Sequence, residues 1–166
     1  MNPPPTYSII ASPLGKILLT ATPPGLGGLW IMGEKHCPAI HPDWREDPGA
    51  FAAANLQLTE YFFGTRRGFD LPLHATGTAF QQEAWAALRQ IPYGQTRTYQ
   101  QQAAVIGRPA AVRAVGTANG RNPISIIVPC HRVIGTNGSL TGYGGGLDAK
   151  QWLLAHGARH ARPKLS

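Results

Sequence analysis

The sequence predicts an α+β fold in which a small sheet-and-helix half is followed by a mostly helical half. Two observations carry this prediction. Short β-prone runs separated by Pro- and Gly-containing turns fill the first third of the 166 residues, and helix-start signals dominate from residue 77 onwards. We therefore expect two domains, an N-terminal α/β domain at residues 1–75 and a C-terminal domain at residues 76–166.

The N-terminal half is predicted to form a small antiparallel sheet with one helix against it. Residues 7–11, 16–21 and 26–32 are β-prone and are separated by turn sequences. A polar loop is expected to follow through Asp47. Apolar residues then recur at roughly helical spacing over residues 49–63, and the glycine that follows is a suitable helix end.

The C-terminal half contains strong helix punctuation. Residues 78–81 form a capping box that opens a helix to about Gln90. A second capping box at residues 98–101 opens a helix through Ile106, and a third helix is predicted to run from Pro109 to residue 120. Two helices joined by a short Gly-containing turn are a candidate helix-turn-helix.

The third helix of this half differs from a helix that reads DNA bases. It is rich in Ala and Gly and has one long basic side chain, Arg113. A base-reading helix usually presents several polar side chains to base edges. The composition therefore favours close backbone approach to DNA with one inserted arginine over sequence readout.

The remaining segments surround a cysteine. Residues 125–128 form a short apolar run that is predicted to be a buried strand or extended segment, and Pro129 stops it. Cys130 follows at the turn. Residues 141–146 are glycine-rich and are expected to form a loop, and a last helix is predicted from Asp148 to His156, closed by Gly157.

Composition limits the classes of function. The formal net charge is +7, which favours a polyanionic partner. The N-terminus lacks the features of a signal peptide and no apolar run reaches membrane-spanning length, so we expect a cytoplasmic protein that does not bind membranes. The two cysteines, Cys37 and Cys130, show neither disulfide nor zinc-finger spacing, and His36 and His41 near Cys37 are interpreted as surface sequence. No metal site is predicted.

Cys130 is the candidate nucleophile. A thiol reacts as the thiolate, which needs a nearby base or positive charge, and His131 and Arg132 follow Cys130 directly. On these residues alone, a buried thiol followed by a surface histidine is the more ordinary interpretation.

A larger set of motifs favours a reactive Cys130 over a buried structural thiol. The region from residue 77 to 156 resembles the O6-alkylguanine-DNA alkyltransferase family in the order and spacing of its motifs. The matching segments are Gly77-Thr78-Ala79-Phe80-Gln81-Gln82 with Trp85, Ile91-Pro92-Tyr93-Gly94, Thr98-Tyr99, Arg113-Ala114-Val115-Gly116, Asn122-Pro123, Pro129-Cys130-His131-Arg132-Val133-Ile134 and Leu140-Thr141-Gly142-Tyr143. The N-terminal third resembles the family only in layout.

The resemblance implies a role for each matching residue. Cys130 is then the alkyl acceptor, His131 the base that draws off its proton through water, and Asn122 the brace of the active-site turn. Tyr99 rotates the damaged nucleotide out of the duplex and hydrogen-bonds the flipped base, and Arg113 fills the vacated place. The resemblance further implies a substrate pocket at Tyr143 and Gly144. It extends less closely to Gln100, Arg108 and Thr136, which it implies as phosphate-contacting positions.

The same resemblance implies the reaction and the partner. The expected activity is a single-turnover transfer of an alkyl group from O6-alkylguanine in double-stranded DNA to the cysteine, with O4-alkylthymine as a further candidate substrate. No cofactor is required, and the protein is expected to be a monomer. The implied fold is a small α/β domain followed by a winged helix-turn-helix-like domain that binds DNA and holds the active site.

One position departs from the family pattern. The family usually has a glutamate near the end of the last helix, where it holds the far nitrogen of the histidine, whereas this chain has Gly157 and no acidic residue after Asp148. Loss of a carboxylate that orients a histidine lowers reactivity strongly. Two interpretations follow: slower transfer with His131 oriented by another group, or a lesion-binding alkyltransferase-like protein with weak or no transfer. Retention of Cys130 favours the first.

Two rival functions come from other classes. One is a helix-turn-helix transcription regulator with Cys130 as a redox sensor, and the Ala/Gly-rich third helix speaks against it. The other is a Cys-His hydrolase, which needs an oxyanion hole that the sequence does not locate.

Overall fold

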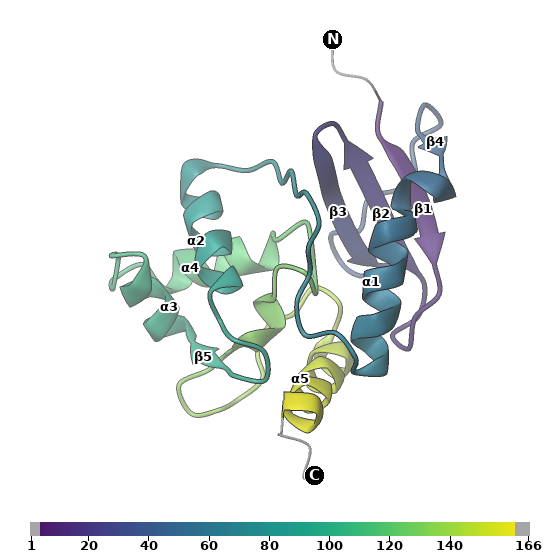
Figure 1. The fold of residues 1–166 in the computed structure, drawn as a ribbon. Coiled ribbons are helices and arrows are strands. Elements are labelled where there is room, and N and C mark those ends of the chain that lie inside the picture. The colour runs from purple at the N-terminus through teal and green to yellow at the C-terminus, as the bar shows by residue number, and fades with distance from the viewer. Residues whose placement is uncertain (1–3, 162–166) are drawn as a thin grey trace. The chain divides into compact units, whose positions relative to one another are not determined.

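The structure is a computed structural model that describes residues 4–161. The chain divides into two compact units (Figure 1). One unit contains the chain up to Thr76 together with Pro123–Ile127, and the other contains Gly77–Asn122 and the chain from Val128 onwards. The predicted α+β class is confirmed, with a sheet and helix in the first unit and a helical second unit.

The first unit is built on a four-stranded sheet. Its strands are β1 (Thr6–Ile10), β2 (Ile17–Thr22), β3 (Gly25–Ile31) and β4 (Arg45–Glu46), in the order β3-β2-β1-β4. The first three strands pair antiparallel as predicted. The sheet also contains a strand that was not predicted, β4, which pairs parallel with β1 and makes the sheet mixed. This strand lies in the predicted polar loop; it has only two exposed residues, too few to show an alternating pattern.

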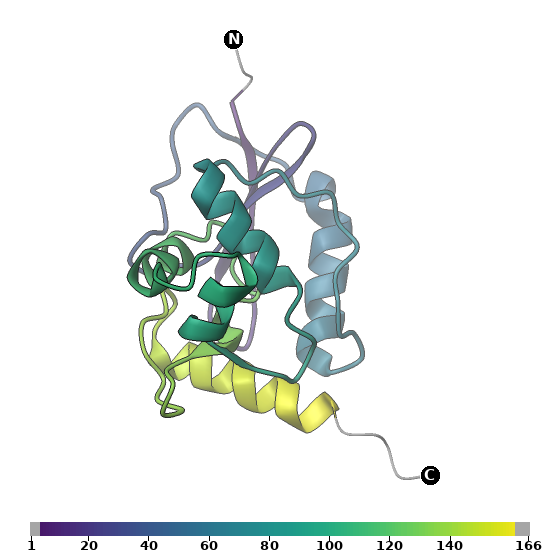
Figure 2. The ribbon, with the colours of Figure 1, turned by 90° about the vertical axis from the view of Figure 1, so that its left-hand side faces the viewer.

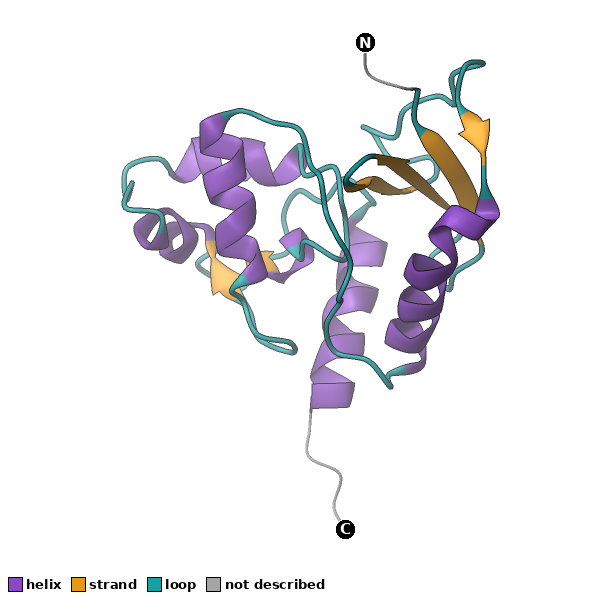
Figure 3. Cartoon of the chain, turned by 45° about the horizontal axis from the view of Figure 1, so that its top comes forward, coloured by secondary structure: helices purple, strands orange, loops and turns teal. Residues whose placement is uncertain are grey.

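A helix lies along one face of the sheet, as Figure 1 and Figure 3 show. A 3-10 turn, η1 (Pro48–Phe51), leads into α1 (Ala52–Phe63). Gly64 ends α1 with a left-handed φ of 85°, which confirms the predicted end. Strand residues and helix residues such as Leu19, Leu29 and Leu58 are completely buried and form the core of this unit.

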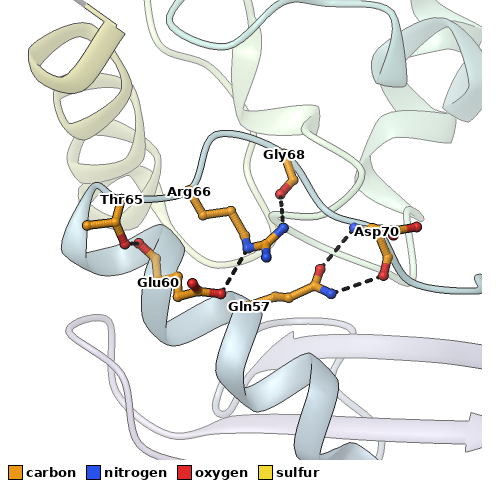
Figure 4. A network of polar contacts seen from close by, with 6 residues as sticks. All are labelled: Gln57, Glu60, Thr65, Arg66, Gly68 and Asp70. Carbon is orange, nitrogen blue, oxygen red and sulfur yellow. Dashed lines mark hydrogen bonds and ion pairs between the residues drawn. The ribbon is translucent and has the colours of Figure 1, made fainter.

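Side-chain hydrogen bonds fix the segment that leaves α1 (Figure 4). The amide of Gln57 exchanges two hydrogen bonds with the backbone of Asp70, at 3.0 and 2.9 Å. Arg66 pairs with Glu60 at 3.2 Å and donates to the carbonyl of Gly68. This exit segment is therefore ordered by its own polar contacts with α1.

The second unit contains helices α2 (Ala79–Arg89), α3 (Tyr99–Val105), α4 (Val112–Gly120) and α5 (Leu147–Ala161). Figure 2 shows the first three of them facing the viewer. Two short strands, β5 (Arg97–Thr98) and β6 (Val133–Ile134), pair parallel. Both predicted capping boxes are present, with Thr78 and Thr98 each accepting from the backbone three residues on. None of the helices within residues 4–161 has the length and apolar character needed to cross a membrane.

The helix-turn-helix is locked by a pair of buried amides. Gln102 of α3 donates to Asn119 Oδ1 at 2.9 Å, and Asn119 of α4 donates back to Gln102 Oε1 at 2.8 Å. Gln102 also donates to the carbonyl of Ala84 in α2 at 3.1 Å. Trp85 of α2 donates to the carbonyl of Ala118 at 2.9 Å. These bonds fix α3 and α4 against α2.

Two predicted elements of this region are wrong in detail. α4 begins at Val112 and not at Pro109, because the Ala111 amide bonds the Arg108 carbonyl and closes a separate turn first. Residues 125–128 are buried as predicted but are not a strand. Ile126 has a φ of 73°, and the Ile127 amide bonds the Ser125 carbonyl, so the chain turns there.

The prediction that Gly157 closes the last helix is also wrong, because α5 continues to Ala161. Gly157 is buried, and a Cβ placed there would lie 3.6 Å from the backbone of Gly94. A glycine inside a helix costs only about 1 kcal/mol relative to alanine, so packing on its neighbours carries α5 through this position.

Candidate active site

A tight turn holds the candidate nucleophile. Cys130 begins a short 3-10 helix, η2 (Cys130–Arg132), directly after Pro129. The Cys130 amide bonds the Val128 carbonyl at 2.8 Å, and the Arg132 amide bonds the Pro129 carbonyl at 3.0 Å. Cys130 is only 8% exposed. The backbone therefore fixes the position of the sulfur before any substrate binds.

Asn122 contacts the sulfur directly. Its Nδ2 donates to the Val128 carbonyl at 2.8 Å and to Cys130 Sγ at 3.2 Å, and its own amide bonds the Asn119 carbonyl at the end of α4. A hydrogen-bond donor aimed at sulfur favours the thiolate over the thiol. The amide thus connects the end of α4 with the active-site turn.

His131 is a buried histidine. It is 1% exposed, and its Nδ1 has no hydrogen-bond partner among residues 4–161. Its ring meets the edge of Tyr143 with the centroids 6.5 Å apart. Burial, aided by the positive charges of Arg132 and Lys150, holds the pKa of His131 well below its usual range. His131 is therefore neutral at physiological pH.

Arg132 has a structural partner of its own. Its guanidinium donates to the Ile91 carbonyl at 2.9 Å and lies 5.5 Å from the centre of the Tyr93 ring. The basic residue that follows His131 in sequence therefore holds the turn at residues 91–94.

Tyr99, at the first turn of α3, is attached to the glycine-rich loop. Its hydroxyl donates to the Thr141 carbonyl at 3.2 Å. Gly116 of α4 lies beside its ring, since a Cβ at that position would be 3.9 Å from Tyr99 Cδ1. The Nζ of Lys150 donates to the same Thr141 carbonyl at 2.8 Å. The loop, α3 and α5 therefore meet at one carbonyl oxygen.

Lys150 is the functional candidate that sequence reasoning missed. It is completely buried, whereas lysine is usually exposed. A signal was available: Lys150 lies three residues before Leu153 on the buried face of α5, where an apolar residue is expected.

The predicted DNA-contacting residues lie apart from this buried cluster, at exposed positions. Arg113 is exposed on α4, Gln100 on α3 and Thr136 in the turn at residues 135–139. Arg108 is exposed but already engaged: it pairs with Glu83 at 3.5 Å and lies over the Phe80 ring. The pocket candidates Tyr143 and Gly144 are half-buried in the glycine-rich loop.

Within residues 4–161, no three His, Cys, Asp or Glu side chains are grouped so that they could hold a metal ion. Cys37, the second cysteine, is half-buried in the first unit and is not part of the cluster around Cys130. The buried cluster around Cys130 combines the thiol with an amide donor, a neutral imidazole and a buried ammonium.

Family models match both parts of the chain. The DNA-binding domain of 6-O-methylguanine DNA methyltransferase matches residues 79–159, and the ribonuclease-like domain of the same enzyme matches residues 6–75. With the buried thiol and the helix-turn-helix, these matches define the class as a DNA-repair methyltransferase that binds DNA. The chain belongs to the methylated-DNA--protein-cysteine methyltransferase family.

Relatives from bacteria and archaea agree over nearly the whole chain. The methylated-DNA--protein-cysteine methyltransferase of Mycolicibacterium paratuberculosis is 49% identical and covers 96% of both chains. That of Methanosarcina barkeri is 53% identical over 89% of this chain and 94% of its own. The crystal structure of Mycobacterium tuberculosis OGT in complex with DNA matches with a TM-score of 0.88 and 48% identity, covering 93% of this chain and 94% of that one.

Proposed function

We propose that this protein repairs O6-alkylguanine in double-stranded DNA by moving the alkyl group to Cys130 in a single turnover. The sulfur forms a bond to the alkyl carbon, and the bond from that carbon to guanine O6 breaks with its electron pair left on the guanine. The proton lost by the thiol ends on the departing guanine, which restores the normal base. The thioether that remains is a poor leaving group, so each molecule acts once. O4-alkylthymine is a further candidate substrate.

The contact between Asn122 and the Cys130 sulfur, at 3.2 Å, is the observation that carries this proposal. It gives the sulfur a donor that favours the thiolate within a turn already fixed by backbone hydrogen bonds. Neutral His131 is suited to relay the thiol proton, because an unprotonated imidazole accepts a proton at one nitrogen while the other donates. The chemistry needs no cofactor.

The damaged base must leave the duplex to reach a buried sulfur. We assign the displacement to Tyr99, whose hydroxyl then hydrogen-bonds the base, and the replacement in the stack to the exposed Arg113. Tyr143 and Gly144 of the glycine-rich loop line the base pocket. The phosphate contacts come from Gln100, Arg108 and Thr136. Arg108 must first break its ion pair with Glu83.

Within the described part of the chain His131 Nδ1 has no hydrogen-bond partner, which favours a second candidate, a lesion-binding protein with weak transfer. A family glutamate at the position of Gly157 would hold that nitrogen, and nothing among residues 4–161 does so here. The retained thiol and its bond from Asn122 speak for transfer. The two candidates differ in the fate of the alkyl group and not in DNA binding.

The finer assignments are part of the same proposal. The N-terminal domain is residues 1–75, and the C-terminal domain, residues 76–166, carries the DNA-binding and alkyl-transfer activities. The partner is double-stranded DNA that contains the lesion, and the protein acts as a monomer in the cytoplasm. Light scattering during size-exclusion chromatography, with and without duplex, tests the monomer; cell fractionation tests the location.

Intact-mass measurement tests the function. The protein is incubated with a duplex that contains one O6-methylguanine, and a stable gain of one methylene on the Cys130 peptide is expected. The Cys130→Ser variant is the control for the site, and Cys37→Ser is the matched control for the other thiol. An unchanged mass despite lesion-specific binding supports the lesion-binding candidate; absence of both transfer and lesion-specific binding refutes the proposal.

A further inference from the structure

A buried lysine of α5 has no role in the mechanism described above. Lys150 is completely buried, and its backbone amide bonds the Gly146 carbonyl, which joins the start of α5 to the glycine-rich loop. Removing an ammonium from water is costly unless it gains partners. Because it is buried, Lys150 is also not placed to contact DNA phosphates as a surface cation. The burial of the Lys150 ammonium must therefore be explained by contacts inside the protein.

The contacts of Lys150 supply one part of that explanation. Its Nζ donates to the Thr141 carbonyl at 2.8 Å, and the Tyr99 hydroxyl donates to the same oxygen at 3.2 Å. The ammonium also lies 5.9 Å from the centre of the Tyr99 ring, within the range of a cation–π interaction. Lys150 therefore holds the glycine-rich loop and the tyrosine in one arrangement.

The charges around the sulfur supply the other part. The positive charges near His131 are Arg132 and Lys150, and both oppose a third positive charge on the imidazole. Arg132 is directed to the Ile91 carbonyl and the Tyr93 ring. Attraction between Cys130 and Lys150 works against the burial that lowers the pKa of the lysine. Helix α5, which carries Lys150, packs against η2, the turn that begins at Cys130, so the ammonium and the sulfur belong to one buried cluster.

From these contacts we propose that Lys150 is a positioning residue for alkyl transfer, whose ammonium both clamps the Thr141 carbonyl and balances the charge of the Cys130 thiolate. In this assignment His131 relays the proton, and the counter-charge of the thiolate is Lys150. This inference rests on the proposed function for the transfer step. The charge pairing itself is independent of DNA.

Thiol titration of the full-length protein tests the counter-charge. Reaction of Cys130 with iodoacetamide is followed across pH in a Cys37→Ser background, without DNA. Lys150→Met is expected to slow the reaction at neutral pH about tenfold or more and to raise its pH midpoint by about one unit. Lys150→Arg keeps the charge and is expected to remain nearer the parent protein. If Lys150 is purely structural, neither Lys150→Met nor Lys150→Arg shifts the pH midpoint of the reaction. An unchanged midpoint in Lys150→Met therefore overturns the proposal.

The His131→Gln variant gives an independent test that does not depend on the folding of Lys150→Met. If His131 is neutral at rest, its loss leaves the midpoint within about half a unit of the parent value. A rise of about one unit or more assigns the counter-charge to an imidazolium and overturns the proposal. Methyl transfer from an O6-methylguanine duplex is measured alongside. A parent protein that gains no methylene refutes the proposed function, while the iodoacetamide midpoints still decide the role of Lys150.

Discussion

The burial of His131 makes the folded protein less stable at acidic pH. In the unfolded chain the imidazole titrates near 6.5, its ordinary value, and in the folded protein burial holds its pKa well below that. Below about pH 6.5 the unfolded state therefore binds a proton that the folded state refuses. The free energy of unfolding falls as pH falls through this window, and above it His131 contributes nothing to the pH dependence.

The size of the effect follows from proton linkage. Each pH unit below the unfolded pKa costs about 1.4 kcal/mol for one excluded proton. Between about pH 7 and about pH 5 the loss from His131 alone is therefore at most about 2 kcal/mol. In His131→Gln this part of the acid sensitivity is expected to disappear, whatever the stability of the variant at neutral pH.

Urea unfolding at both pH values, for the parent protein and for His131→Gln, measures the difference. The exposed His74 provides a matched control, because His74→Gln removes a surface imidazole and leaves the buried one in place. If His131→Gln loses as much stability on acidification as the parent protein, to within about 0.5 kcal/mol, the imidazole is not held neutral and our account of its burial is wrong.

Three further predictions concern transfer. Gly157→Glu is expected to raise the single-turnover rate about tenfold or more by giving His131 Nδ1 a carboxylate partner, and an equal gain in Gly157→Gln would contradict that reason. Asn122→Leu removes the donor to Cys130 Sγ and is expected to slow iodoacetamide reaction about 10- to 100-fold; a rate equal to the parent's would count against the contact. Arg113→Ala is expected to slow methyl transfer from duplex DNA at least about tenfold, because base flipping costs a few kcal/mol, while iodoacetamide reaction stays unchanged.

Local signals in the sequence predicted the helices well. The capping boxes at Thr78 and Thr98 specify where α2 and α3 begin, because a side chain three residues from its backbone partner needs no distant contact. The three antiparallel strands of the first unit followed from β-prone runs and turn residues in the same way. These features depend on neighbours in sequence.

The wrong predictions concern segments whose conformation depends on contacts with residues distant in the sequence. β4 is a strand only because β1 presents a free edge to Arg45 and Glu46, and no local pattern records that pairing. Gly157 has the sequence features of a helix end, yet α5 continues past it against Gly94. The left-handed Ile126 is a conformation that β-branched residues rarely adopt, so its sequence predicted an extended segment.

In the candidate site, too, local motifs were informative and the effects of distant packing were not predicted. Cys130, His131 and Asn122 were predicted as site residues from motifs that lie close together in the chain. The structure adds the hydrogen bond from Asn122 to the sulfur. It also shows that no group within residues 4–161 bonds His131 Nδ1. Lys150 was missed because its burial results from the packing of α5, and a lysine in sequence carries the expectation of exposure.

The amide pair of Gln102 and Asn119 has a consequence for how this protein family can vary. Two amides that exchange hydrogen bonds in a buried site accept no single replacement easily, because either change leaves a buried donor and acceptor without a partner. Replacement of both by apolar residues of similar shape removes that cost. The two positions are therefore expected to change together or not at all among relatives. The angle between α3 and α4 is then kept or altered by both residues at once.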